Sequence, residues 1–258
     1  MFVTRSTLEA LLAEGEAAPV AGWDFSWLEG RATEERPSWG YARMLVPRVA
    51  GPASVLDVQT GGGEVYAEVL GQVGDRPAYL AATESWPPNV QIARNNLHTF
   101  GVSVAEVADD AAVPFPGERF DLVVSRHPTV TLWGEIARVL RPGGTYLSQQ
   151  VGAGTNRELT HFMMGPQPVS GRQSTARAMD LATQAGLTVV DLREETLRTV
   201  FYDVGAVVYF LRKVLWTVPG FSVDAYRSQL VAMHEHIERE GAFVSHSRRF
   251  LIEAKKAA

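Results

Sequence analysis

The chain has 258 residues, of which 46% are hydrophobic, so it can bury the core of one full α/β domain with additions or of two small ones. With a formal net charge of -5 at pH 7, the chain lacks the overall excess of basic residues that neutralises a nucleic-acid backbone. Cysteine is absent, which excludes disulfides, thiolate nucleophiles and cysteine-ligated metals.

The first residues predict a helix over residues 6–16, capped by Ser6, because Leu8, Leu11 and Leu12 recur on one helical face. This stretch has no basic start followed by an apolar run, so it does not resemble a secretory signal. No segment reaches roughly 18 uninterrupted apolar residues, the length that a membrane-spanning helix needs. We therefore expect a soluble, cytoplasmic protein with no membrane partner.

Aromatic residues gather between positions 23 and 41, in a segment without regular periodicity. Trp39 and Tyr41 end this segment. Large rings with a polar tip suit the edge of a core, and we expect these rings to fill such an edge.

The next stretch predicts a strand, a glycine-rich turn and a helix. An apolar run through Val55 and Leu56 reaches the acidic Asp57, Gly61–Gly63 follows, and residues 65–73 have helical periodicity. Glycine has no side chain and tolerates positive φ, so such a turn lets backbone N–H groups approach a small polar ligand. The dinucleotide fingerprint G-x-G-x-x-G is incomplete here, since Tyr66 stands at its third glycine.

An acidic residue follows the second predicted strand, which covers residues 78–83. This residue, Glu84, comes 21 residues after Gly63. In a nucleoside-binding βαβ unit, a carboxylate roughly 20 residues beyond the glycine turn accepts the ribose hydroxyls. Trp86–Asn89 then predicts the start of a helix, because prolines are tolerated in a first turn.

Charged residues also follow the third and fourth predicted strands. Asp109 and Asp110 come after a strand over residues 102–104, and Ser125–Pro128 comes after a strand over residues 120–124. Open α/β sheets bind their ligands beyond the carboxyl ends of the strands. These residues are therefore candidate ligand-binding groups.

The rest of the chain continues the alternation of helices and strands. Further helices are expected over residues 133–140, from about 154 to 162, and over 175–185, 204–216 and 223–240, with strands over 145–151, 189–197 and 243–252. On the helix over residues 223–240, His234 and His236 are two positions apart and point in different directions. We therefore predict no metal site.

The segment D-V-Q-T-G-G-G at residues 57–63 resembles motif I (D/E-x-G-x-G-x-G) of the class I S-adenosylmethionine-dependent methyltransferases. Asp57, Gly61 and Gly63 match this motif, whereas Gln59 stands where its first glycine is usual. Because glutamine has a side chain, this departure affects how closely the backbone of the loop can approach a ligand.

Two later segments resemble the same family. The string A-D-D-A-A-V-P-F at residues 108–115 is similar to its G-D-A-x-x-L-P-F motif. The string A-R-V-L-R-P-G-G-T-Y-L at residues 137–147 resembles its helix, turn and fifth strand. With motif I and Glu84, these matches cover about residues 54–150 in the order and spacing of the family.

The resemblance implies a Rossmann-like α/β fold with a seven-stranded, mostly parallel sheet flanked by helices and one antiparallel strand near the C-terminus. It also implies a single methyltransferase domain over residues 1–258. In this division, residues 1–50 form an N-terminal helical cover, residues 51–152 bind the cofactor, and residues 153–258 complete the sheet and shape the acceptor pocket with a C-terminal insertion.

The implied cofactor is S-adenosyl-L-methionine. In the family, the residue at Glu84 accepts the ribose hydroxyls and the residue at Asp109 accepts from the adenine amino group. The residues expected around the cofactor are Asp57, Gln59, Gly61, Gly63, Glu84, Trp86, Asp109, Asp110 and Ser125. As an alternative to the edge of the core, Trp39 and Tyr41 would cover its methionine end.

His127 is the candidate general base and Arg126 the candidate group that orients the acceptor or binds a carboxylate, because the family places such groups after the fourth strand. An unperturbed histidine, with a pKa of about 6.5, suits proton removal near neutral pH. The alternative is that His127 only forms a hydrogen bond within the loop before Pro128.

These expectations favour methyl transfer to a small-molecule acceptor. An RNA methyltransferase would share the same core, so nucleic acid is disfavoured but stays open. A regulatory module that binds the cofactor without transferring its methyl group is the third possibility, which the departure at Gln59 allows. The sequence predicts neither the acceptor nor the oligomeric state.

Overall fold

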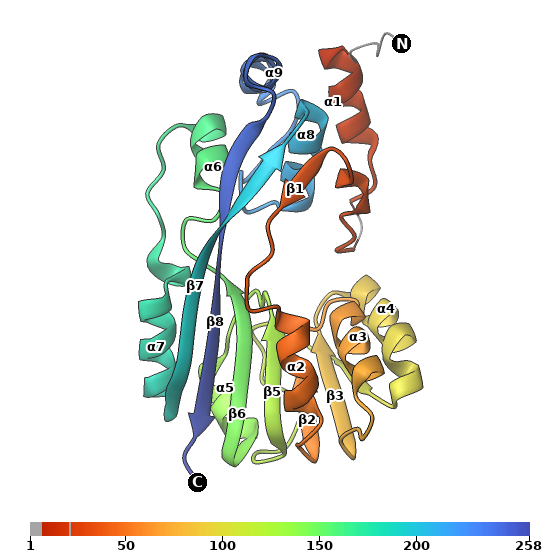
Figure 1. Cartoon of the computed structure of the whole chain (residues 1–258), viewed down its shortest axis with the longest axis vertical. Coiled ribbons are helices and arrows are strands. Elements are labelled where there is room, and N and C mark those ends of the chain that lie inside the picture. The colour runs from red at the N-terminus through yellow and green to blue at the C-terminus, as the bar shows by residue number, and fades with distance from the viewer. Residues whose placement is uncertain (1–6, 21) are drawn as a thin grey trace. The chain divides into compact units, whose positions relative to one another are not determined.

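A computed structural model describes residues 7–20 and 22–258 (Figure 1). The helices are α1 (Leu8–Ala17), α2 (Tyr41–Val49), α3 (Glu64–Gln72), α4 (Pro87–Leu97), α5 (Trp133–Val139), α6 (Arg157–Met164), α7 (Thr175–Gln184), α8 (Val204–Lys213) and α9 (Arg227–Glu240), with 3-10 helices η1 (Ser26–Leu28), η2 (His98–Phe100) and η3 (Gly171–Gln173). The strands are β1 (Ala32–Glu34), β2 (Ser54–Asp57), β3 (Tyr79–Glu84), β4 (Ser103–Glu106), β5 (Phe120–Arg126), β6 (Leu140–Val151), β7 (Leu187–Phe201) and β8 (Phe243–Lys256).

The described residues pack as two compact units. Unit 1 holds the described residues up to 36 together with residues 154–170 and 196–248, and unit 2 holds residues 37–153, 171–195 and 249–258. Strands β7 and β8 contribute residues to both units. The division of a single domain at residues 50 and 152 stays a prediction.

The strand order is β1-β7-β8-β6-β5-β2-β3-β4. The pairs β2–β3, β2–β5, β3–β4 and β5–β6 are parallel, and β6–β8 is antiparallel. The expected seven-stranded, mostly parallel sheet is thus confirmed, with β8 as the antiparallel strand near the C-terminus. The short strand β1 is additional and pairs antiparallel with the part of β7 that belongs to unit 1, where Thr33 lies opposite Val200.

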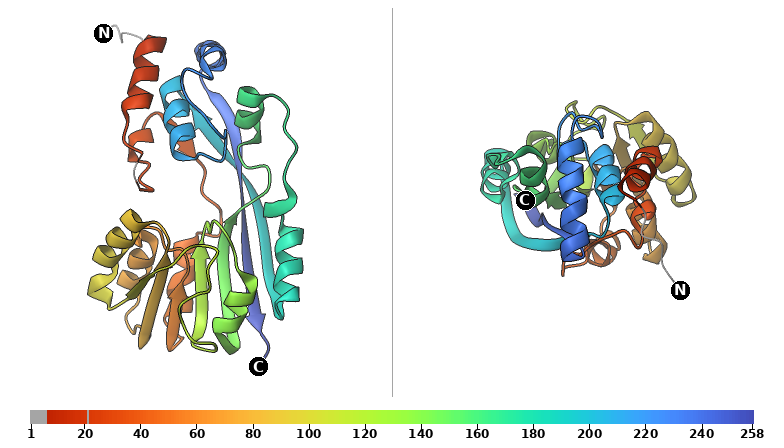
Figure 2. Two further views of the ribbon diagram at one scale, coloured as in Figure 1. Left: turned by 180° about the vertical axis from the view of Figure 1, so that it is seen from behind. Right: turned by 90° about the horizontal axis from the view of Figure 1, so that it is seen from above.

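The sheet of unit 2 is apolar on both faces, as buried parallel sheets are. Val55 of β2 and Val124 of β5 belong to one apolar cluster with residues of α2, α3 and α4, whereas Leu56 and Val123 belong to a second with residues of α5 and α7. Figure 1 shows α2 and α3 on one face of this sheet, and Figure 2 shows α5 and α7 on the other. Alternate side chains along each strand therefore supply two separate helix-covered cores.

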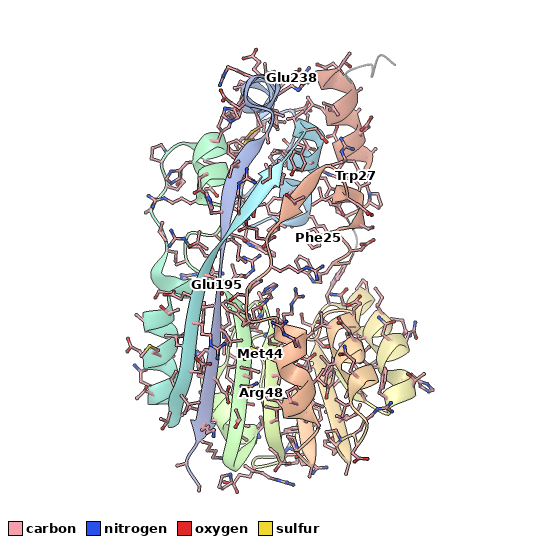
Figure 3. All side chains as sticks on the ribbon, in the orientation of Figure 1. Phe25, Trp27, Met44, Arg48, Glu195 and Glu238 are labelled. Atoms are coloured by element: carbon pink, nitrogen blue, oxygen red, sulfur yellow. The ribbon has the colours of Figure 1, made fainter. Side chains whose placement is uncertain are left out.

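Helix α2 was not predicted from the sequence. Pro47 lies inside it and cannot donate a backbone hydrogen bond, which weakens the helical signal. Tertiary packing overrides this cost, because Leu45 and Val49 are buried and Arg48 forms a 2.8 Å ion pair with Glu253 of β8. Figure 3 labels Met44 and Arg48 on this helix. Tyr41, at the start of this helix, is buried in the core of unit 2.

The N-terminal helix begins at Leu8, where the Thr7 hydroxyl accepts from the backbone N–H of Ala10. The expected cap, Ser6, lies outside the described residues. In unit 1, this helix and α6, α8 and α9 share one apolar cluster, and nearly all of α8 is buried. Within residues 7–20 and 22–258, none of the helices combines the length and apolar character needed to cross a membrane.

We expect Phe120→Ala to lower the free energy of unfolding by about 3–5 kcal/mol, the usual range for an aromatic side chain removed from a core. The ring is fully buried, with centroids 5.2 Å from Phe115 and 5.8 Å from Tyr79. Val190→Ala, at a half-exposed position of β7, is the control and should change stability by about 0.5 kcal/mol or less. Urea unfolding measures both, and equal effects would contradict the assignment of Phe120 to the core.

Candidate active site

The loop after β2 adopts left-handed backbone angles at three alternate positions. φ is 57° at Gln59, 65° at Gly61 and 77° at Gly63. A Cβ at Gly63 would also lie 2.9 Å from the Leu97 side chain on α4, so this position needs glycine for space as well as for its φ. The loop therefore packs directly against the following helices.

The carboxylate of Glu84 joins this loop to the next one. Its Oε2 accepts from the backbone N–H of Gly61 at 2.8 Å, and its Oε1 accepts from that of Trp86 at 3.0 Å. Burial raises the pKa of Glu84 above its usual value, and the nearby charge of Asp109 adds to this effect, against the lowering by the backbone donors. The carboxyl group is thus fixed in place at the end of β3.

Asp57, the last residue of β2, is the most perturbed carboxyl group of this edge. Burial raises its pKa to about 7, and the charge of Glu84 adds to that effect. The Thr60 hydroxyl donates to Asp57 Oδ2 at 2.6 Å and opposes the shift, as does the charge of Arg126. Near neutral pH, Asp57 therefore exists in both protonation states.

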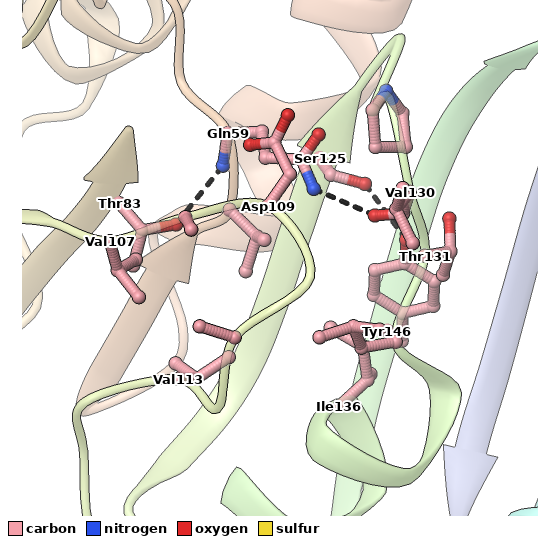
Figure 4. A pocket seen from close by; sticks show the side chains of 15 residues that line it. Gln59, Thr83, Val107, Asp109, Val113, Ser125, Val130, Thr131, Ile136 and Tyr146 are labelled. Atoms are coloured by element: carbon pink, nitrogen blue, oxygen red, sulfur yellow. Dashed lines mark hydrogen bonds between the residues drawn. The ribbon is translucent and has the colours of Figure 1, made fainter. Parts of the chain in front are cut away.

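A narrow pocket opens beside this loop, and its outline encloses about 400 Å³ when the open solvent at its mouth is included (Figure 4). Asp109, Gln59, Thr83 and Ser125 supply polar lining. Its apolar lining includes Val58, Val107, Val113, Val130, Ile136 and Tyr146. An apolar hollow with a single carboxylate suits a flat heterocycle that carries an amino group.

The side chain of Gln59 crosses the mouth of the pocket. Its amide nitrogen donates to the Val130 carbonyl at 2.7 Å, and its amide oxygen accepts from the Thr129 backbone N–H at 2.6 Å. The backbone N–H of Gln59 donates to the Thr83 hydroxyl at 3.1 Å (Figure 4). Gln59 thereby attaches the loop after β5 to the loop after β2, which the sequence did not indicate.

Ser125 lies at the centre of a buried hydroxyl network at the end of β5. Its Oγ lies 2.8 Å from the hydroxyls of Tyr146 and of Ser148, and its carbonyl oxygen accepts from the Tyr41 hydroxyl at 2.9 Å. Tyr41 and Trp39 are thus buried within unit 2 and contact the carboxyl end of the strands β5 and β6 through hydrogen bonds.

His127 follows β5 with a φ of 54°, a left-handed value that is uncommon outside glycine. Its Nε2 lies 2.8 Å from the side-chain amide nitrogen of Gln149. The amide oxygen of Gln149 accepts from the Trp39 indole N–H at 2.8 Å. Burial, and then the charges of Arg126 and Arg249, hold the pKa of His127 well below 6.5, so the ring is neutral at pH 7.

The structure brings the expected site residues together in two groups. Gly61, Glu84 and Trp86 are linked by hydrogen bonds at the glycine loop, and Gln59, Asp109 and Ser125 line the pocket. Asp110 is exposed and does not line it, and the Trp86 ring is 40% exposed. Among the residues that the structure describes, no group of three or more histidine, aspartate or glutamate side chains is placed to hold a metal ion.

Part of the chain matches a known protein family. Residues 56–148 match the model of a methyltransferase domain family. This match places residues 56–148 in a methyltransferase domain. The search of curated proteins finds no match.

Solved structures share the fold at low sequence identity. A candidate methyltransferase from Bacillus halodurans is 17% identical with a TM-score of 0.58, over 85% of this chain and 100% of that one. The cyclase SpnF is 18% identical with a TM-score of 0.52, over 97% and 93%. A geranyl diphosphate methyltransferase, in complex with geranyl diphosphate and sinefungin, is 15% identical with a TM-score of 0.51, over 85% and 79%.

The pattern A-R-V-L-R-P-G-G has a structural explanation in this methyltransferase domain. Arg138 of α5 donates at 2.8 Å to the carbonyl oxygens of Val113 and of Phe115, and Glu135 accepts from the Val113 backbone N–H at 2.7 Å. Arg138 and Glu135 also form an ion pair with each other. This pair fixes the segment that follows Asp109.

The donor and acceptor chemistry of the site fits S-adenosylmethionine. The cofactor has ribose hydroxyls and an adenine amino group as donors, and this edge of the sheet offers the carboxylates of Glu84 and Asp109 as acceptors. Its sulfonium charge also suits an acidic neighbourhood. Gly61 and Gly63 have no side chains and leave the backbone of this loop open to a ligand. The side chain of Gln59 covers the loop at one position.

The pH dependence of stability should report the buried Asp57. The pKa of Asp57 is about 7 in the folded protein, against a reference value of 3.8 that represents the unfolded chain, so folding favours the protonated form. The stability that the protonated carboxyl group allows is fully present below pH 3.8 and is lost as pH rises toward 7. The loss amounts to about 4 kcal/mol, at about 1.4 kcal/mol per tenfold change in an ionisation constant.

Asp57→Asn should therefore gain stability relative to the wild type as pH rises from 5 to 8, when urea unfolding is measured at each pH. The asparagine side chain keeps an oxygen for the Thr60 hydroxyl and carries no charge. Asp75→Asn, at an exposed position, controls for the loss of one negative charge. A stability difference between wild type and Asp57→Asn that is constant over this pH range would contradict the raised pKa.

Gln59→Gly should release the loop after β5, because the Thr129 N–H loses its acceptor and the Val130 carbonyl loses its donor. We expect amide hydrogen exchange at Thr129 to become at least about tenfold faster. Global stability should change by only about 1 kcal/mol, because glycine removes the cost of positive φ at this position. Gln91→Ala, on the exposed face of α4, is the control, and unchanged exchange at Thr129 would refute the attachment.

Proposed function

We propose that the chain transfers a methyl group from S-adenosylmethionine to a small organic acceptor. The observation that supports this proposal most directly is the Glu84 carboxylate, held by the N–H groups of Gly61 and Trp86 beside the pocket of Asp109. In this proposal, Glu84 accepts the ribose hydroxyls and Asp109 accepts from the adenine amino group. S-adenosylmethionine supplies an electrophilic methyl group on a positively charged sulfur.

The other expected residues surround the same ligand in this proposal. Gly61 and Gly63 let the backbone come close, the Asp57 carboxyl group lies beneath the loop, and Trp86 offers an exposed ring beside it. Gln59 and Ser125 line the pocket, and the exposed Asp110 contributes at most its negative charge to the surroundings.

His127 and Arg126 are proposed to act on the acceptor side. A neutral His127 meets the first requirement of a general base, and Arg126, exposed at the end of β5, can orient an acceptor through its charge. The Nε2 lone pair of His127 is, however, already engaged by Gln149. The protein therefore contributes mainly by holding donor and acceptor in line, which can supply about 7–11 kcal/mol of barrier lowering.

A small acceptor is favoured over RNA by the net charge of -5. The geranyl diphosphate methyltransferase with a similar fold acts on a small molecule. The cyclase SpnF has the fold as well, so the fold alone does not decide the reaction. Release of S-adenosylhomocysteine with a candidate acceptor is the observation that would separate transfer from mere binding, and steep weakening of acceptor binding with salt would indicate RNA.

Calorimetry with S-adenosylhomocysteine should show that Glu84→Gln weakens binding about 10- to 100-fold, as expected when hydrogen bonds to a charged group are lost. Glu64→Gln, at the exposed start of α3, is the matched control and should leave the affinity unchanged. Thermal unfolding of both variants checks that the loop still folds. Equal affinities of the two variants would show that Glu84 does not bind the ribose. Tight binding of NAD in place of S-adenosylhomocysteine would show that the cofactor assignment is wrong.

A further inference from the structure

The hydrogen bonds of Gln149 have only one consistent direction. The indole N–H of Trp39 can only donate, so the amide atom 2.8 Å away must be the oxygen of Gln149. The amide nitrogen of Gln149 therefore faces Nε2 of His127, also at 2.8 Å. Because an amide nitrogen only donates, Nε2 of His127 must accept and carries no proton.

The proton of a neutral His127 must then lie on Nδ1. None of the described residues accepts a hydrogen bond from Nδ1. The Nδ1 atom is also not fully buried, because the described polar atoms that are buried without a partner do not include it. Nδ1–H is thus an accessible donor beside the end of β5.

The surroundings keep this arrangement neutral. The charged side chains that act on His127 are Arg126 of β5 and Arg249 of β8, and both disfavour an imidazolium. Gln149 is 3% exposed and Trp39 is 5% exposed, so water does not compete readily for their hydrogen bond. The backbone N–H of His127 also donates to the Gln149 carbonyl at 2.7 Å, which holds the two residues in register.

We infer that Trp39 and Gln149 are positioning residues that hold His127 as a hydrogen-bond donor at Nδ1, so that it binds an oxygen of the methyl acceptor and is not a general base. The part of this inference that concerns the acceptor rests on the proposed function. A base needs an unshared lone pair, and His127 has none: Nε2 is engaged by Gln149 and Nδ1 is protonated. A donor beside the positive charge of Arg126 suits a carboxylate or carbonyl oxygen next to the atom that receives the methyl group.

Long-range proton–nitrogen correlation spectra of the protein labelled with ¹⁵N-histidine test the tautomer directly, without cofactor or acceptor. The chain has six histidines, and His127→Asn identifies the signals of His127. At pH 7 we expect a protonated Nδ1 and an unprotonated Nε2. A protonated Nε2 in the wild type would overturn the inference.

Gln149→Glu should move the proton. A carboxylate accepts from both Trp39 and His127, so it requires a proton on Nε2 and should raise the pKa of His127, which the same spectra measure over pH. Gln91→Glu adds the same charge on the exposed face of α4 and should leave the His127 signals unchanged. A merely structural role of Gln149 would alter stability without exchanging the protonated nitrogen, and an unchanged tautomer in Gln149→Glu would refute the inference.

Trp39→Phe keeps a ring in the core and removes only the donor. We expect the Gln149 amide then to populate both orientations, and the single Nδ1–H pattern of His127 to be lost. If this variant does not fold, the wild-type and Gln149→Glu spectra still decide the question. Retention of the single pattern in folded Trp39→Phe would show that Trp39 does not set the tautomer.

The class of acceptor is tested with two probes of the same size. Titration with sodium benzoate in the presence of S-adenosylhomocysteine should shift the Nδ1–H signal of His127, whereas benzylamine should not. The assignment of an oxygen acceptor is overturned if benzylamine alone shifts the signal, or if neither probe shifts it. The proposed function fails separately: absence of S-adenosylhomocysteine binding in calorimetry would reject it, while the tautomer found without cofactor would stand.

Discussion

The structure of the site depends on one carboxylate that two backbone N–H groups hold at the end of β3. Glu84 accepts from Gly61 in one loop and from Trp86 in the next, so the loops that follow two neighbouring parallel strands are fixed through a single charge. Parallel strands bring their carboxyl ends to the same edge, and the left-handed angles of Gly61 and Gly63 direct the backbone toward that edge. Thr83 of β3 supports the same attachment, because its hydroxyl and carbonyl oxygens accept from the backbone N–H groups of Gln59 and Thr60.

The same edge concentrates negative charge in a buried place, which is costly for the fold. The charge of Glu84 adds to the burial that raises the pKa of Asp57, and the charge of Asp109 acts in the same way on the pKa of Glu84. Carboxyl groups that repel one another are stabilised by a ligand with a positive charge and several hydrogen-bond donors, and S-adenosylmethionine has both. A binding function predicts such repulsion between buried carboxyl groups at the site. The rest of the fold, with an apolar core on either face of the sheet, follows the ordinary rules of packing.

The features of the sequence that indicated the fold are local or periodic. The apolar strands, the glycines of the loop and the spacing to Glu84 each leave a pattern within about 30 residues, and the structure confirms the strands. The contacts between Gln59 and Val130 and between Trp39 and Gln149 join residues 71 and 110 positions apart, and no local pattern records such pairs. Helix α2 was missed for a related reason, since burial of Leu45 and Val49 outweighs the cost of Pro47 only in the folded chain.

The substitution of a motif glycine by Gln59 shows how a departure from a family pattern can be compensated. The backbone keeps the left-handed conformation that glycine would adopt, at a cost of about 1–3 kcal/mol for a residue with a side chain. The two hydrogen bonds of its side chain, together worth about 1–3 kcal/mol, offset that cost. The loop that they hold is the one that begins at His127, so the residue that stands in place of the motif glycine also restricts the motion of this second loop. A glycine at this position would remove both side-chain hydrogen bonds between the two loops, and only backbone contacts such as that between Val58 and Val124 would remain.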